Sequence, residues 1–279
     1  MIDADTEQRI ADFARLIRAR TVQMVATSGS SHVGSALSIA DVIAVLYADV
    51  LRIDPADSAW SGRDRFLLSK GHACSIVYAA LASRGFFPVE ELDQYAQPGS
   101  RLLAHISHRV PGVEFSTGSL GHGLPFAVGK AHAAKKSGKS WHTFVVLGDG
   151  EMDEGSNWEA LLFAAHNRLS NLTAIIDANN LQSLTTVDET LGLEPLGDKL
   201  RAFGAEVFEG DGHDLAFLRS VLVPDSTSQE FSRGPRVIIA RTVKGKGVSY
   251  MENSVAWHYK SPNPEQLAQA LEEIGQFRA

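Results

Sequence analysis

Two polar residues, each placed shortly after an apolar run, are well suited in this sequence to bind a ligand. Asp149 follows the run 142–147, and Asn179 follows the run 172–177. In open α/β sheets, ligands bind outside the carboxyl ends of the strands. Asn179 lies 30 positions after Asp149, a separation that one helix and one strand would fill. The spacing therefore predicts that Asp149 and Asn179 lie side by side at one edge of a sheet.

The residues around this pair favour a divalent cation that binds phosphate. An aspartate repels an anion unless a cation lies between them, and carboxylate, amide and carbonyl oxygens are ligands of Mg²⁺. The predicted ligands are Asp149, Asn179 and the main-chain carbonyl of Leu181, a set that Ca²⁺ or Mn²⁺ would also accept. Gly150 lets the backbone approach a ligand closely. The competing interpretation is that Asp-Gly and Asn-Asn simply form turns.

The elements that must position these residues follow from the spacing of apolar side chains. Strand and helix patterns alternate, which predicts an α/β fold with a parallel sheet flanked by helices on both faces. Ser38 followed by Asp41 resembles a capping box at the start of one helix, and residues 97–119 predict a long functional loop. We expect one domain over 1–279, with an irregular tail and a last helix at 244–279. The expected strands are 65–69, 142–147, 172–177, 205–208 and 236–243, and the expected helices are 7–27, 38–51, 73–83, 120–136, 157–167, 199–203 and 215–222.

Composition and charge narrow the class of protein. The chain has 279 residues and a formal net charge of −7, which argues against nonspecific binding of nucleic acid. Its single cysteine excludes an internal disulfide framework and a multi-cysteine zinc site. No apolar run approaches the roughly 20 residues that span a bilayer, and the amphipathic N-terminus is unlike a signal peptide. We therefore expect a cytoplasmic protein with no membrane or nucleic-acid partner.

One spaced pattern resembles the thiamine-diphosphate fingerprint, namely 148–150 (GDG), then about 30 residues, then Asn179 and Asn180. Four longer stretches resemble the transketolase family and occur in the family order. They are 30–34 (SSHVG) with 37–41 (LSIAD), 64–72 (DRFLLSKGH), 111–121 (PGVEFSTGSLG) and 148–160 (GDGEMDEGSNWEA). The remaining domains of the family do not fit into 279 residues. The resemblance therefore implies the N-terminal, diphosphate-binding subunit of a split, two-chain transketolase.

The resemblance carries further implications for fold, cofactor and partner. It implies the thiamine-diphosphate-binding (PP-domain) fold, with thiamine diphosphate and Mg²⁺ as cofactors. The implied reaction transfers a two-carbon ketol unit from a ketose, as its phosphate, to an aldose. The implied partner is a C-terminal subunit that supplies the pyrimidine-binding domain and the activating glutamate, in an α2β2 heterotetramer. The resemblance also implies that Gly150 and Glu151 line the diphosphate. His72 would contact the diphosphate, as would Asn179 through the cation, and Gly118, Ser119 and Leu120 would support the central part of the cofactor.

Three histidines match the family positions that face the reacting carbons of the substrate. They are His32, His105 and His258, and a near-neutral pKa would suit them for proton transfer to and from substrate hydroxyls. His105 lies in a loop beside His108, where either side chain could simply be exposed, and the match of His258 is loose. The remaining histidines are interpreted as structural or exposed: His122, His132, His142, His166 and His213.

Some residues depart from the family pattern. Val33 follows His32, and Ile106 follows His105, where the family has proline. These changes leave the cofactor assignment intact and leave the identity of the sugar open. The segment 244–247 (KGKG) resembles a phosphate loop but lacks the Walker spacing. We interpret it as a flexible, solvated turn.

Three other functions agree with part of the pattern. Other thiamine-diphosphate enzymes, deoxyxylulose-phosphate synthase-like or dehydrogenase E1-like, are disfavoured by the stretch 111–121. Phosphatases of the haloacid-dehalogenase type also use GDGxxD, and 3–6 (DADT) imitates their nucleophile motif, but only two residues precede Asp3 where a buried strand is needed. A noncatalytic scaffold subunit would not need the aspartate and histidines named above.

Overall fold

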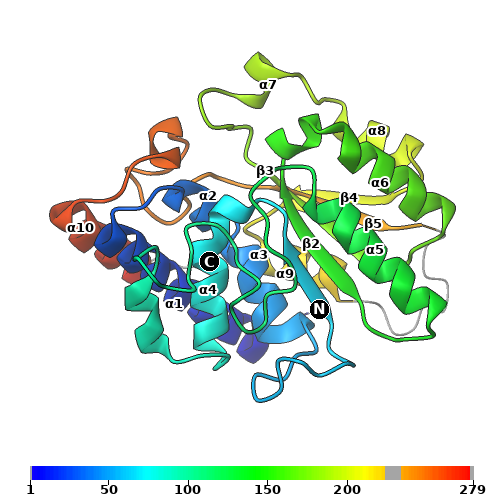
Figure 1. Ribbon diagram of the computed structural model, residues 1–279. Helices are drawn as coiled ribbons and strands as arrows, with labels where there is room; N and C mark the ends of the chain where they lie inside the picture. Colours follow the sequence, from blue (N-terminus) through cyan, green and yellow to red (C-terminus); the bar gives the residue numbers. More distant parts are fainter. Residues whose placement is uncertain (1, 224–233, 277–279) are drawn as a thin grey trace.

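A parallel sheet forms the centre of the chain in this computed structural model, which describes residues 2–223 and 234–276 (Figure 1). The strands pair in the order β1-β2-β3-β5-β4, and every pair is parallel. The predicted α/β class is confirmed, and each of the five expected strands is present. They are β1 (Arg65–Leu68), β2 (Thr143–Gly148), β3 (Leu172–Ala178), β4 (Glu206–Asp211) and β5 (Arg236–Arg241).

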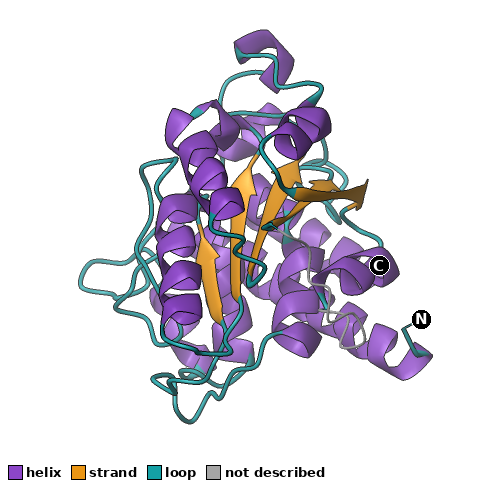
Figure 2. Cartoon of the chain, turned by 90° about the vertical axis from the view of Figure 1, so that its right-hand side faces the viewer, coloured by secondary structure: helices purple, strands orange, loops and turns teal. Residues whose placement is uncertain are grey.

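Helices cover both faces of the sheet, as Figure 2 shows. Successive side chains of a strand point to opposite faces, so Phe144 and Val146 of β2 pack in one core while Val145 and Leu147 pack in the other. All four side chains are almost completely buried. Strands buried on both faces read as continuous apolar runs rather than alternating ones, which is why short apolar runs located β1, β2, β3 and β5 in the sequence, whereas β4 is partly exposed.

The N-terminal and C-terminal helices share one face (Figure 1). There α1 (Ala4–Ser28) packs against α3 (Ala40–Val45), α4 (Cys74–Ser83) and α10 (Pro264–Gln276), and α2 (Val33–Ser38) and α9 (Leu215–Leu222) join the same core. The side chain of Asp3 accepts a hydrogen bond from Thr6 N at 2.9 Å and caps α1. The sequence 3–6 therefore begins a helix, which excludes its role as a phosphatase nucleophile at the end of a strand.

The opposite face carries α5 (Gly123–Lys136), α6 (Gly155–His166) and α8 (Leu196–Ala202), which lie together in Figure 1. Short helical turns join the larger elements: α7 (Val187–Thr190), η2 (Gly71–Ala73), η3 (Val89–Gln94), η4 (Gly150–Asp153) and η5 (Val255–His258). Residues 97–122 contain neither helix nor strand, as the predicted long loop requires. None of the helices in the described ranges has the length and hydrophobicity needed to traverse a lipid bilayer.

The second expected helix differs from its prediction. In place of a helix over 38–51, α2 ends at Ser38, α3 begins at Ala40, and a π-helical turn, η1 (Leu46–Val50), follows. Ser38 Oγ donates to Asp177 at 2.7 Å, and Asp41 pairs with Arg18 inside the core. The predicted capping box is therefore wrong, because both of its side chains are committed to distant tertiary partners.

Candidate active site

Four neighbouring strands end around one cavity of about 220 Å³. Lys70 follows β1, Asp149 follows β2, Asn179 follows β3 and Lys244 follows β5. The cavity is lined by every site residue predicted from the sequence except Ser119, which is exposed outside it. The predicted residues in the lining are His32, His72, His105, Gly118, Leu120, Asp149, Gly150, Glu151, Asn179, Leu181 and His258.

The predicted proximity of Asp149 and Asn179 is confirmed. Strands β2 and β3 pair in register with Gly148 opposite Asp177. One carboxylate oxygen of Asp149 accepts from Asn180 N at 2.6 Å, and Asn179 Oδ1 accepts from Leu181 N at 3.0 Å. The two strand tips therefore meet, and the backbone that follows β3 turns back beside the carboxylate.

The donor set at these tips fits a divalent cation. It offers a carboxylate, an amide and a main-chain carbonyl, which are oxygen ligands of the kind that Mg²⁺ and Ca²⁺ prefer. Burial, followed by the charge of Asp177, raises the pKa of Asp149 to about 6, because the ionised form is costly away from water. A cation against Asp149 would remove that cost. A Cβ at Gly150 would lie 2.7 Å from the Gln182 side chain, so a larger residue there would displace that side chain.

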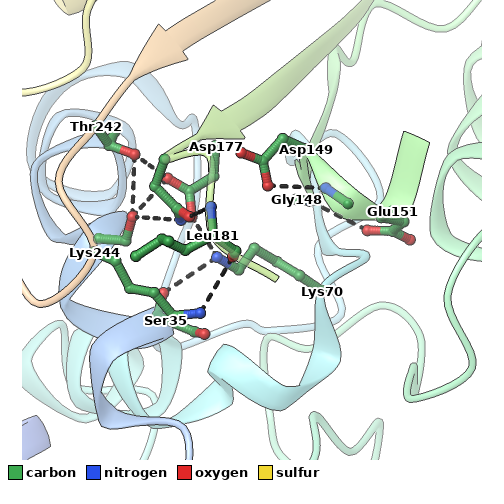
Figure 3. A network of polar contacts seen from close by, with 12 residues as sticks. Ser35, Lys70, Gly148, Asp149, Glu151, Asp177, Leu181, Thr242 and Lys244 are labelled. Carbon is green, nitrogen blue, oxygen red and sulfur yellow. Dashed lines mark hydrogen bonds and ion pairs between the residues drawn. The ribbon is translucent and has the colours of Figure 1, made fainter. Parts of the chain in front are cut away.

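Glu151 lines the cavity, but protein groups already occupy its carboxylate. It accepts from Ser69 Oγ, from Gly121 N at 2.9 Å and from Gly148 N at 3.4 Å; Figure 3 shows the last of these bonds. Burial raises its pKa, although these hydrogen bonds act in the opposite direction. Glu151 therefore ties the loop that contains Gly118 and Leu120 to the end of β2.

A buried ion pair lies under the cavity (Figure 3). Lys70 Nζ pairs with the carboxylate of Asp177 and donates to Ser35 O at 3.2 Å. The hydroxyls of Ser38 and Thr242 donate to the same carboxylate. The sequence analysis did not predict Lys70 as a site residue. Its position directly after a buried strand, at the carboxyl edge of the sheet, could have indicated it.

A second buried lysine corrects the interpretation of the segment 244–247. Lys244 is 1% exposed, and its Nζ donates to Leu181 O at 3.2 Å and to Gln182 O at 3.0 Å (Figure 3). It also lies 3.2 Å from His258 Nδ1. The prediction of a solvated turn is therefore wrong for Lys244, because the turn faces the cavity rather than solvent.

Four histidines converge on this cavity. The ring centroid of His32 lies 5.1 Å from that of His72, 5.7 Å from that of His105 and 4.9 Å from that of His258. His32 has φ 74°, an unusual backbone conformation for a residue other than glycine. Its N–H donates to His258 O at 2.8 Å, which joins two segments that lie far apart in the sequence.

The histidines have lower pKa values than the near-neutral ones expected from the sequence. Burial, followed by the charges of His105, Lys244 and Lys70, lowers the pKa of His32 to about 4. Burial and then Lys244 lower the pKa of His258 to about 3, and burial also lowers the pKa of His72 and His105. All four are therefore neutral at neutral pH. An anion in the cavity would raise these values, because it favours the protonated form.

The remaining histidines lie outside the cavity, as predicted. His142 bonds Thr173 through Nε2 at 2.8 Å, and His213 contacts Asp41. His122 and His166 are exposed, and His132 is partly buried.

The fold and the cavity together define an α/β protein with a cavity lined by acidic, basic and histidine side chains at the carboxyl edge of its parallel sheet. Residues 7–277 match the family model described as transketolase, thiamine diphosphate binding domain. The chain therefore belongs to the transketolase family, in its thiamine diphosphate-binding section.

Two relatives and one solved structure place the chain more closely. It is 43% identical over 263 residues to an apulose-4-phosphate transketolase subunit of Actinobacillus succinogenes, in an alignment that covers 94% of each chain. It is 40% identical over 262 residues to a 6-deoxy-6-sulfo-D-fructose transketolase subunit of a Clostridium species, again with 94% of each chain covered. A crystal structure of transketolase from Campylobacter jejuni superimposes with a TM-score of 0.87 at 31% identity. That alignment covers 98% of this chain and 43% of the Campylobacter chain.

Proposed function

We propose that this chain is the thiamine-diphosphate-binding subunit of a two-chain, Mg²⁺-dependent transketolase. The reaction is transfer of a two-carbon ketol unit from a ketose phosphate to an aldose. One observation carries the proposal: the predicted cation ligands and four histidines line the same cavity at the carboxyl edge of the sheet. Relatives of nearly the same length that are named as transketolase subunits support the two-chain arrangement.

The residues at the strand tips would hold the cofactors. Asp149, Asn179 and the carbonyl of Leu181 are the proposed ligands of Mg²⁺, and His72 and the backbone at Gly150 would contact the diphosphate. Lys70 and Lys244 give the cavity positive charge next to the proposed metal site. When bound, thiamine diphosphate supplies the reactive carbon that takes up the ketol unit, while the protein orients it.

The other lining residues would act on the substrate. Neutral histidines accept and donate protons through their two ring nitrogens. His32, His105 and His258 are the proposed groups that move protons to and from the substrate hydroxyls, since their rings surround one space. Gly118 and Leu120 would form the wall against which the central part of the cofactor rests, with Ser119 at its exposed rim.

A partner subunit would cover the open side of the cavity. Apolar side chains follow directly on lining residues there: Leu184 is 80% exposed and Tyr259 is 58% exposed. Exposed apolar groups beside a binding cavity are typical of protein interfaces. We propose a C-terminal subunit with a pyrimidine-binding domain as this partner, an α2β2 assembly in the cytoplasm, and one domain for residues 1–279.

Reconstitution with the partner subunit tests the proposal. The expected result is formation of a new ketose from a ketose phosphate and an aldose, dependent on Mg²⁺, on thiamine diphosphate and on both chains. Pyruvate offered as donor distinguishes the synthase-like and dehydrogenase-like alternatives. A complex that binds the cofactor and cleaves no ketose would contradict transketolase activity, and a complex that binds no cofactor would contradict the site itself.

A further inference from the structure

Three side chains from distant parts of the sequence form a buried chain of hydrogen bonds beside the segment that carries Lys244. Arg18 lies on α1, Asp41 lies on α3, and His213 lies between β4 and α9. Asp41 accepts from Arg18 at 2.9 Å and 2.5 Å, and its Oδ2 lies 2.7 Å from His213 Nδ1. Burial would raise the pKa of Asp41, but Arg18 and His213 outweigh it and lower the pKa to about 2. The buried carboxylate is therefore ionised and accepts from both neighbours.

The hydrogen bonds of His213 define one tautomer of its ring. Val243 N lies 2.9 Å from His213 Nε2, and a main-chain N–H can only donate. Nε2 therefore carries no proton, and the proton of the neutral ring is on Nδ1, where it is donated to Asp41. A proton on Nε2, either in the charged ring or in the opposite tautomer, would place the Nε2–H donor against the Val243 N–H donor.

The same cluster holds both sides of Lys244. His213 accepts from Val243 N on one side, and Arg18 Nε donates to Lys246 O at 3.3 Å on the other. Between them, Lys244 extends into the cavity, where its Nζ bonds Leu181 O and Gln182 O and lies 3.2 Å from His258 Nδ1. The position of the segment 243–246 therefore determines where the Lys244 ammonium group lies in the cavity.

We propose that His213, protonated on Nδ1, is a positioning residue that fixes the segment 243–246 and thereby places Lys244 against the Leu181 carbonyl and His258. His213 itself is not among the residues that line the cavity. The inference rests on the proposed function, because Leu181 and His258 matter to the reaction only if the cavity binds the cation, cofactor and sugar. The effect of His213 on the backbone of the segment 243–246 can be measured without cofactor.

Three substitutions separate the two hydrogen bonds of His213. His213→Gln places an amide oxygen where Nε2 accepts from Val243 N. His213→Asn places an amide N–H near Asp41 but is too short to reach Val243. His213→Ala removes both bonds. His142→Gln is a matched control, because His142 likewise hydrogen-bonds a protein group through Nε2, Thr173 Oγ1 at 2.8 Å, but lies directly before β2, at the opposite edge of the sheet.

Hydrogen exchange of the full chain without cofactor is the first measurement. We expect peptides over 242–247 to exchange about tenfold faster in His213→Ala and His213→Asn, with β3 unchanged, because only the local hold is lost. His213→Gln should restore protection of 242–247, and His142→Gln should leave it at the wild-type level. Unchanged exchange in His213→Ala, an equal rise in β3, or rescue by His213→Asn as complete as by His213→Gln would overturn the proposal.

Affinity for thiamine diphosphate is the second measurement, made at saturating Mg²⁺ on the complex with the partner subunit. We expect the Kd to rise about tenfold in His213→Ala and His213→Asn, as is typical when the support of a ligand residue is removed, and to recover in His213→Gln. A Kd that stays at the wild-type value in His213→Ala would overturn the positioning role. A wild-type complex that binds no cofactor would contradict the proposed function instead, and the exchange result would still decide whether His213 holds the segment.

Discussion

At the scale of single residues, Asp149 has opposing effects on stability and on cation binding. Its carboxylate is buried, and its pKa rises to about 6 from an ordinary value of 3.8, so the folded chain holds a proton more tightly than the unfolded chain. This carboxylate therefore destabilises the cation-free fold as pH rises through that window, and the loss is complete above pH 6. A cation bound by the buried Asp149 carboxylate would offset this destabilisation.

Asp149→Asn should remove the pH-dependent destabilisation of the cation-free chain and abolish its response to Mg²⁺. The change removes a shift of about two pKa units, which corresponds to up to about 3 kcal/mol at neutral pH, and the gain should vanish below about pH 4, where the aspartate is protonated in both states. Urea unfolding at several pH values, with and without Mg²⁺, measures both effects. Asp188→Asn on α7, where the side chain is exposed, is the control. A variant that keeps the wild-type Mg²⁺ response would show that Asp149 is not a ligand.

Lys244 should control the basicity of His258. Burial is the largest cause of the low pKa of His258, about 3, and the charge of Lys244 is the next. Lys244→Met removes that charge, so the pKa of His258 should rise by about one unit. An NMR titration of the His258 Cε1 proton measures the change, with Lys139→Met at the opposite edge of the sheet as control. No movement of the His258 titration in Lys244→Met would argue against their contact.

The site residues that the sequence revealed differ physically from those it did not. Asp149 and Asn179 were predictable because strand length and helix length fix their separation, and parallel pairing then brings them together. Lys70 and Lys244 were not, because a lysine acquires its role from what surrounds it after folding. The Lys-Gly-Lys-Gly sequence that begins at Lys244 favours a solvated turn, whereas tertiary contacts turn the segment inward: Gly245 N donates to Gly34 O of α2 at 3.0 Å, and Lys244 Nζ lies 3.2 Å from His258 Nδ1.

At the scale of elements, the strands were predictable and the break between α2 and α3 was not. Strands buried on both faces are continuous apolar runs, a signal contained within each run. The break depends on Ser38, whose hydroxyl bonds Asp177 from a strand 139 positions away. Local patterns cannot show such a partner, so the polar residues there were interpreted as a helix cap.

Two glycines of α5 should respond in opposite directions to the same substitution. A Cβ at Gly123 would lie 2.3 Å from Ser69 Oγ and 2.7 Å from Ser69 Cα, whereas a Cβ at Gly129 would meet nothing within 4 Å. Gly123→Ala should therefore destabilise by about 1–3 kcal/mol, through the overpacking of a filled interface. Gly129→Ala should stabilise by about 0.5–1 kcal/mol, because alanine favours a helix interior. Urea unfolding of both variants measures these changes in the free energy of unfolding.

The Gly123→Ala substitution should also affect cofactor binding in the cavity. Ser69 Oγ bonds both Gly123 N and Glu151, and Glu151 holds the loop that contains Gly118 and Leu120. Displacing Ser69 should therefore weaken cofactor binding in Gly123→Ala, while Gly129→Ala keeps the wild-type affinity. Destabilisation of Gly123→Ala with unchanged cofactor affinity would show that the start of α5 does not support the loop.

At the scale of the whole molecule, the chain contains one side of a cavity that remains open. The lining comes from the carboxyl ends of β1, β2, β3 and β5 and from the loops beside them. Three exposed apolar residues, Leu103, Leu184 and Tyr259, each lie within two positions in the sequence of a lining residue. A partner that buried them would also exclude water from the histidines and the strand tips.

Leu184→Glu should leave the fold of this chain intact and weaken its association with the partner subunit. Leu184 is 80% exposed, so a charge there costs little in the free chain, but burying that charge against an apolar surface would raise the Kd of the complex, by about tenfold or more. Leu16→Glu, the same change on α1, is the matched control, since in the described part of the chain α1 contributes no residue to the cavity lining. Sedimentation of the mixed subunits measures association, and the melting temperature of each free variant reports its fold. If both variants associated equally well with the partner, the interface would not include Leu184. That result would contradict the proposal that the partner covers the open side of the cavity.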